Sequence, residues 1–267
     1  MAASEGVDLE WCIIDKLGGN AGGKKFSDKI LSQGEKCAAN IRKFAGSKKL
    51  EAWHSDDSTN PFNIAIFGNP EPKTDIVLRI GGKVYSVSVK MAGAVQLASG
   101  QGSSTADLFE AAASQIKNGT KSKVLKSIIT ELRTMPTRLL SDSNKSRILS
   151  EASDKVIGEF IRSGKIIQDK SYDYWLKHNK VQLMEMMLQY VEKDKDFTKA
   201  LLYEALTGKI SLKKYKGAPA DSMISPAGFY LIDDRYVEKI MSKVKFDIRG
   251  KSRSGITGIA FRIDLRP

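Results

Sequence analysis

Two residues of opposite charge, Asp75 and Lys90, stand at the outer ends of a predicted β-hairpin. The hairpin turns at Gly81-Gly82, where glycine supplies the positive φ angles that a two-residue turn needs. Antiparallel pairing brings the first and last residues of a hairpin together, so we expect the Asp75 carboxylate beside the Lys90 ammonium. A carboxylate and an ammonium at the open end of a sheet can hold a divalent cation, activate a water and stabilise charge on a phosphate.

The order Pro72-Lys73-Thr74-Asp75, a hairpin, and Ser88-Val89-Lys90 resembles the signature of the PD-(D/E)xK nuclease superfamily, in its SxK variant. The resemblance spans roughly residues 25 to 120. It implies a restriction-endonuclease-like mixed sheet flanked by helices. It also implies an endodeoxyribonuclease that hydrolyses DNA phosphodiesters with Mg²⁺ or Mn²⁺. In that family the first Asp and the second acid bind the metal, and the Lys orients or activates the water.

Carried over residue by residue, the resemblance assigns metal binding to Asp75, with the Val89 carbonyl as a further ligand, and the water to Lys90. Ser88 stands where the family has its second acid, and serine is a poor Mg²⁺ ligand. Two interpretations stay open. Either the following helix supplies the missing carboxylate through Glu110, since Asp107 is expected to cap that helix, or catalysis has been lost and the fold only binds.

Members of the superfamily often add an acid from a helix before the first strand of the motif. Glu35 is the candidate here, because it lies beside the apolar stripe of the predicted helix 27–44. Glu10, Glu51 and Glu71 are the alternatives. A single acid of this kind is more often a solvated surface charge than a metal ligand.

The elements that must position these residues follow from the spacing of apolar side chains. A period near 3.6 predicts helices at 7–17, 27–44, 105–117, 124–135, 146–161, 172–191 and 197–206. Period-two or short apolar runs predict strands at 63–67, 75–80, 83–90, 228–232, 244–248 and 256–265. Residues 47–62 and 91–103 are expected to be irregular. This order predicts a mixed α+β protein.

Three consecutive parts are expected along the chain. Residues 1–120 would form a nuclease-like core, residues 121–208 a helical insertion, and residues 209–267 a basic β-rich segment that completes the same domain. The stretch from Tyr203 to Lys209, with Phe246 to Arg262, also resembles phage-encoded proteins of unassigned role. That resemblance implies a viral origin and directs Glu204 toward the site.

The charge of the chain favours a polyanionic partner. Its 267 residues carry 43 Lys and Arg against 31 Asp and Glu, a formal net charge of +12. Basic clusters lie at 209–216 and 243–266, and the predicted phosphate contacts are Lys213, Lys214, Arg249, Lys251 and Arg253. DNA is the expected partner, with RNA, a homodimer and viral assembly partners left open. The alternatives to a nuclease are an inactive nuclease-fold protein that binds nucleic acid or serves in a virion, and a basic protein-interaction module.

Composition excludes other classes. No apolar stretch is long enough to cross a membrane, and the N-terminus lacks the features of a signal peptide, so a cytoplasmic protein, in the host or a virion, is expected. His54 and His178 have no cysteine at zinc spacing, and His54 is expected to be a loop residue. Cys12 and Cys37 lie among apolar residues and are expected to be buried free thiols.

Overall fold

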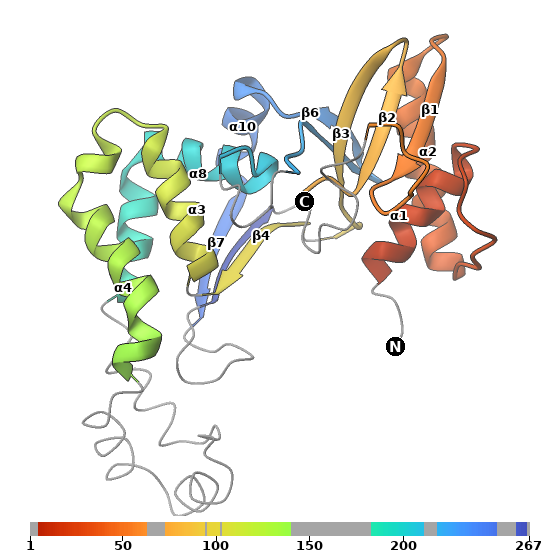
Figure 1. Ribbon diagram of the computed structural model, residues 1–267. Coiled ribbons are helices and arrows are strands. Elements are labelled where there is room, and N and C mark those ends of the chain that lie inside the picture. Colours follow the sequence, from red (N-terminus) through yellow and green to blue (C-terminus); the bar gives the residue numbers. More distant parts are fainter. Residues whose placement is uncertain are drawn as a thin grey trace, which may run out of the picture. The chain divides into compact units, whose positions relative to one another are not determined.

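The computed structural model describes residues 5–62, 73–93, 95–101, 103–139, 183–210, 218–249 and 260–265. The chain forms two compact units (Figure 1). The first combines Met1–Leu97 with Leu202–Val244 and Leu265–Pro267, and the second combines Ala98–Leu201 with Lys245–Asp264. Neither unit is a continuous segment, so the division differs from the three consecutive parts expected from the sequence. The reason is that residues after 218 return to pair with the central hairpin.

A five-stranded mixed sheet is the centre of the first unit, with strand order β1-β2-β3-β5-β6. Its strands are β1 (Leu50–His54), β2 (Ile76–Ile80), β3 (Lys83–Val89), β5 (Ser222–Ser225) and β6 (Gly228–Leu231). The hairpin of β2 and β3 is confirmed, with Ile80 opposite Lys83 and Ile76 opposite Val87. Only β3 and β5 run parallel; the other neighbours are antiparallel.

Two helices, α1 (Glu5–Lys16) and α2 (Asp28–Ala45), pack against this sheet (Figure 1). Helix α2 begins where the Ser27 hydroxyl accepts a hydrogen bond from the Ile30 N–H at 3.4 Å, and it ends at Gly46, whose φ of 60° suits glycine. Buried side chains of both helices and of β2 and β3 share one apolar core. That core includes Cys12 and Cys37, which are buried free thiols as expected.

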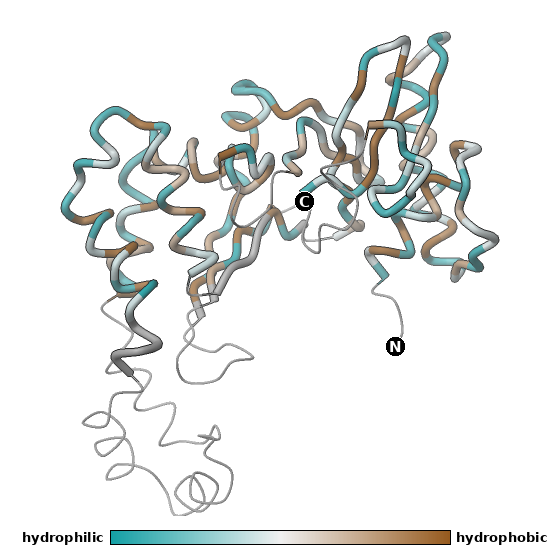
Figure 2. The backbone as a smooth tube through the Cα atoms, viewed as in Figure 1, coloured by the Kyte–Doolittle hydropathy of each residue, from teal (hydrophilic) through white to brown (hydrophobic). Residues whose placement is uncertain are grey.

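The second unit is built around aromatic side chains. Phe109 packs against Phe197 and Phe261, each with ring centroids 5.3 Å away. These rings come from α3 (Ser103–Ser114), α8 (Lys195–Thr207) and β8 (Ala260–Leu265). A short 3₁₀ turn (Gly119–Lys121), α4 (Lys123–Leu139) and helical residues 183–193 complete the described helices of this unit. Figure 2 shows how hydrophobic residues are distributed along the described elements.

Several elements differ from the sequence-based expectation. Residues 50–54 and 95–101 were expected to be irregular but form β1 and β4 (Val95–Gln101). The pairing of Glu51 with Arg79 across β1 and β2 places charged residues inside a strand, which hides its apolar pattern. Strand β4 is rich in small residues and exists by pairing with β8, which also pairs with β7 (Val244–Arg249). Neither β5 nor α10 (Asp234–Met241) was predicted.

Other predictions fall on residues that the structure does not describe. They are the strand at 63–67, the helix at 146–161, most of the helix at 172–191 and the turn that follows β7. Among the described helices, none is long and apolar enough to cross a membrane.

Candidate functional site

The backbone of Asp75 lies between β1 and β3, one residue before β2. Its N–H donates to the Val87 carbonyl at 2.9 Å, and its carbonyl accepts from the Ser55 N–H at 3.0 Å. Its side chain faces the end of β3, where Oδ2 accepts hydrogen bonds from the Val89 N–H at 2.6 Å and the Ser88 hydroxyl at 3.1 Å. Two donors of the SxK segment therefore hold one oxygen of this carboxylate.

Burial and nearby positive groups have opposite effects on the pKa of Asp75. Burial raises the pKa of the Asp75 carboxyl above its usual range. The positive charge of Lys90, the Val89 N–H and the positive charge of Lys73 all lower that pKa, but burial outweighs them. Lys73 is itself buried, and its ammonium donates to the Leu97 carbonyl at 2.7 Å. The site thus combines a partly desolvated carboxylate with two ammonium groups that act on it.

Glu10 of α1 is the second carboxylate of this region. Its Oε2 accepts a hydrogen bond from His54 Nε2 at 3.0 Å. The Asp56 N–H donates to His54 Nδ1 at 3.0 Å, so Nδ1 carries the lone pair and the proton of the neutral ring lies on Nε2. The ring of Trp11 stacks on His54 with centroids 3.9 Å apart and an angle of 9°. His54 is only 1% exposed, so it is a fixed support for Glu10 rather than a loop residue.

The pKa of Glu10 shows that it belongs to the same electrostatic cluster as Asp75. Burial raises this pKa, the hydrogen bond from His54 lowers it, and the negative charge of Asp75 raises it further. The positive charge of Lys90 lowers it. Two poorly solvated carboxylates that repel each other are stabilised when a cation binds to both, so this pair favours cation binding.

The other acids considered from the sequence have different partners. Glu35 is largely exposed and pairs with Lys16 at 3.3 Å. Glu110 lies in the second unit and pairs with Arg133 at 2.6 Å. Glu51 is held by Arg79 and Lys49, which keep the pKa of Glu51 at about 2. Glu71 lies outside the described residues.

Lys213, Lys214, Lys251 and Arg253 lie outside the described residues, and Arg249 is described only as the last residue of β7. Glu204, which the phage resemblance directs toward the site, is fully buried in the first unit. Its carboxylate accepts from the Ile210 N–H at 3.0 and 3.2 Å. This hydrogen bond gives it a role in closing the end of α8.

The donor set of Glu10 and Asp75 can be compared with what a magnesium ion needs. The described hydrogen bonds to these side chains engage Oε2 of Glu10 and Oδ2 of Asp75. Oε1 and Oδ1 are the oxygens left to bind a cation. Among the described residues, no group of three or more His, Cys, Asp and Glu side chains is arranged around a common point. Mg²⁺ commonly uses one or two carboxylates and completes its shell with water and phosphate, so two carboxylates fit this ion and do not fit zinc.

The sequence-based prediction gave no role in the site to His54 and Lys73, and it ranked Glu10 behind Glu35. Glu10 was an alternative to Glu35, His54 was assigned to a loop, and Lys73 was named only as part of the motif. The sequence does contain a feature that could have drawn attention to Glu10 and His54, because each is adjacent to a tryptophan, in Glu10-Trp11 and Trp53-His54. That signal does not say which helix face meets which strand end.

Models of protein families, curated proteins and solved structures contain no match to this chain. Its function is therefore inferred from the geometry of the chain itself.

Proposed function

We propose that the first unit is a metal-dependent nuclease that hydrolyses phosphodiester bonds of DNA with Mg²⁺ or Mn²⁺, on a restriction-endonuclease-like sheet. One observation carries the proposal. Glu10 and Asp75 are carboxyls with raised pKa values that act on each other, each with one oxygen outside the described hydrogen bonds, and the ammonium of Lys90 acts on both. Such a group is suited to a divalent cation and a phosphate.

Each residue has a distinct task in this proposal. Asp75 and Glu10 would hold the ion, which when bound polarises the phosphate and makes a water more acidic. Lys90 would position the water or stabilise charge that develops on the phosphate. His54 holds Glu10 through Nε2–H, and Ser88 with the Val89 N–H holds Asp75. Glu10 takes the part that the sequence had given first to Glu35.

Ser88 favours a second candidate function, in which the protein has a nuclease fold and binds nucleic acid but does not cleave it. The specific observation is that the SxK segment contributes a hydroxyl to Asp75 and no carboxylate of its own. The two functions share the fold and the binding surface, and they differ in whether the carboxylates bring about cleavage.

The test is cleavage of supercoiled and linear DNA in Mg²⁺ or Mn²⁺ by the wild type and by Asp75→Asn, Glu10→Gln and Lys90→Ala. We expect each variant to lose at least about 100-fold in rate, because each removes a group that acts in the reaction. Metal-free DNA binding should stay within about threefold of the wild type, since none of these substitutions removes a predicted phosphate contact of the basic clusters.

Glu35→Gln is the matched control, since it also neutralises a glutamate of an N-terminal helix, but one that is exposed and paired with Lys16. It should cleave at the wild-type rate. Wild-type cleavage by Asp75→Asn or Lys90→Ala would remove this site from consideration. If the wild type binds DNA but does not cleave it, the nuclease function is wrong and the inactive nuclease-fold function is supported.

A further inference from the structure

A cavity of about 470 Å³ lies within the first unit, immediately beyond the SxK strand. Its wall begins at Met91, the residue after Lys90, and continues along β5 at Met223. The Lys90 N–H donates to the Ile224 carbonyl at 2.8 Å, which ties the two strands together at this point. The volume falls in the usual range for small-molecule sites, roughly 300 to 1,000 Å³.

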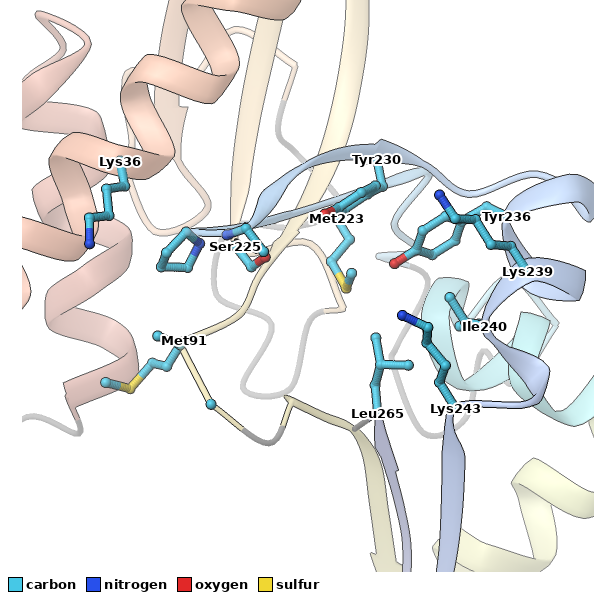
Figure 3. A pocket seen from close by; sticks show the side chains of 14 residues that line it. Lys36, Met91, Met223, Ser225, Tyr230, Tyr236, Lys239, Ile240, Lys243 and Leu265 are labelled. Carbon is cyan, nitrogen blue, oxygen red and sulfur yellow. Dashed lines mark hydrogen bonds between the residues drawn. The ribbon is translucent and has the colours of Figure 1, made fainter. Parts of the chain in front are cut away.

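Aromatic side chains form one wall of this cavity (Figure 3). The rings of Tyr230 and Tyr236 stack with centroids 5.1 Å apart and an angle of 27°. Burial raises the pKa of Tyr236 to about 12, with a further contribution from Tyr230. Its hydroxyl, protonated at neutral pH like that of any ordinary tyrosine, can donate a hydrogen bond. Met223 and Ile240 add apolar surface. A flat ring can therefore stack here and also receive a hydrogen bond.

Three lysines supply positive charge to the same cavity. Tyr236, Lys239, Ile240 and Lys243 follow one another at helical spacing along and just beyond α10, so they share one face. Lys36 comes from α2 and lies at the opposite end from Lys239 and Lys243 in Figure 3. Within the described part of the chain, no carboxylate forms an ion pair with any of these three lysines.

The walls are held in place before any ligand arrives. The Asn40 side-chain amide donates to the carbonyls of Ser225 and Pro226 at 3.3 and 3.2 Å, which fixes the β5–β6 turn on α2. The Asp233 carboxylate accepts from the Tyr236 N–H at 2.8 Å, which fixes the first turn of α10. A site whose walls are already ordered loses less entropy when it binds.

We propose that this cavity binds one nucleotide of a DNA strand, with the base against Tyr230 and Tyr236 and the flanking phosphates on Lys239 and Lys243 and on Lys36. The proposal rests on the nuclease function, because it places a strand beside the end of β3 that carries Lys90. An aromatic wall with cations at both ends suits a nucleotide inside a strand, which has a phosphate on each side, better than a free nucleotide. Base stacking and phosphate contacts of this kind do not depend on sequence.

The experiment is calorimetric titration in EDTA, so that no cleavage occurs, using the Asp75→Asn protein. The ligands are a 5′-phosphorylated thymidine dinucleotide, thymidine 5′-monophosphate, thymidine and inorganic phosphate. We expect the dinucleotide to bind at least about tenfold more tightly than the mononucleotide, and thymidine and phosphate to bind more weakly still. Equal affinity for the two nucleotides would overturn the assignment to a strand, and no preference over thymidine would overturn the site.

Variants of the cavity decide where the ligand binds. Tyr236→Leu and the double variant Lys239→Ala with Lys243→Ala should each weaken dinucleotide binding about tenfold. Lys43→Ala is the control, because Lys43 is an exposed lysine of α2 that does not line the cavity. Circular dichroism checks that each variant is folded, and the two lysines are exposed, so their removal does not disturb the core. Unchanged affinity in both cavity variants would overturn the proposal.

The outcomes separate this proposal from the nuclease function. Binding that depends on the cavity, together with a wild type that never cleaves DNA, would overturn the nuclease and keep a nucleotide site. Cleavage that depends on Asp75, with no effect of the cavity variants on dinucleotide binding, would keep the nuclease and overturn the cavity site.

Discussion

Ser88 occupies the position at which the motif of the resembling family has a carboxylate, and its contacts indicate what a hydroxyl does there. It donates to Oδ2 of Asp75, and the Val89 N–H donates to the same oxygen. Two donors on one oxygen favour the ionised carboxylate and fix its plane, so Oδ1 is left in a defined direction. A second carboxylate at position 88 would instead have repelled Asp75. In the proposed site the second acid comes from α1.

Removing the buried charge of Asp75 should stabilise the metal-free protein at neutral pH. A carboxyl with a raised pKa in the folded state contributes stability that is fully present below its unfolded pKa of about 4 and is lost as pH rises through the raised value. Asp75→Asn should therefore raise the free energy of unfolding at pH 7 and change it little near pH 3. Urea denaturation in EDTA at the two pH values measures the difference.

The same residue should decide the response to Mg²⁺. At about 100 times its dissociation constant, an ion that binds only the folded state adds about 2.7 kcal/mol of stability. The wild type should show this gain, and Asp75→Asn and Glu10→Gln should lose most of it. Glu35→Gln should behave as the wild type because its carboxylate is exposed and paired with Lys16. Equal stabilisation of all four proteins by Mg²⁺ would place the ion elsewhere.

The local part of this site could be predicted from the sequence, and the rest could not. The positions of Asp75 and Ser88 follow from a Gly-Gly turn and period-two pairing, which are properties of adjacent residues. The choice of Glu10 over Glu35 depends on how α1 rotates against β1 and on the burial of His54. Both acids have plausible helical surroundings in the sequence, and the angle between a helix and a sheet is a property of tertiary packing.

At the level of elements, the contact between α1 and α2 sets where Glu10 lies. The two helices meet at Gly34 of α2, where an added Cβ would lie 2.5 Å from Cys12 Sγ and 3.2 Å from Cys12 Cβ. The Cys12 thiol also donates to the Ile30 carbonyl at 3.7 Å. Cys12 and Glu10 lie on the same short helix, so a shift at this contact moves the proposed metal ligand.

Gly34→Ala should destabilise the wild type but not a Cys12→Ala variant. Alanine is favoured over glycine in a helix by about 1 kcal/mol, but overpacking a core commonly costs about 1 to 3 kcal/mol. In the wild type we expect a net loss of about 1 kcal/mol, together with reduced cleavage because α1 is displaced. In a Cys12→Ala background the closest contact is gone, and Gly34→Ala should become neutral or stabilising.

A double-mutant cycle of unfolding free energies measures this coupling. A coupling energy below about 0.5 kcal/mol would mean that the two residues do not compete for the same space. The control is Gly46→Ala, which has a positive φ and open space around it, so its cost should not depend on Cys12.

Some helices and strands could be predicted from the sequence and others could not, depending on whether their apolar residues follow a regular period. Helix α2 and the β2–β3 hairpin have long periodic runs with clear ends and were confirmed. Strands β1 and β5 have only five and four residues, and β4 consists mostly of small and polar residues, so none of the three contains an apolar run long enough to predict a strand. They exist because a neighbouring strand offers hydrogen bonds, and β5 reaches its neighbour from more than 130 residues away.

At the scale of the whole molecule, the net charge of +12 favours polyanions, and its effect depends on which cations are already neutralised. Several lysines of the first unit form ion pairs with carboxylates and therefore contribute little to an external field. Examples are Lys16 with Glu35, Lys29 with Glu5 and Lys49 with Glu51. The cations predicted from the sequence to meet phosphates are Lys213 and Lys214 of one basic cluster and Arg249, Lys251 and Arg253 of the other.

Replacing Arg249, Lys251 and Arg253 together with alanine should weaken DNA binding for all sequences alike and reduce its dependence on salt. Removing one cation that neutralises a phosphate lowers the slope of log K against log salt by about 0.9, so the triple variant should lower it by up to about 2.7. The measurement is fluorescence anisotropy of labelled duplex DNA over a range of salt concentrations, in EDTA. The matched control replaces Lys16, Lys29 and Lys49, which removes the same net charge from lysines already paired with carboxylates. If both triple variants reduce the slope equally, DNA responds to the net charge of the chain and not to this turn.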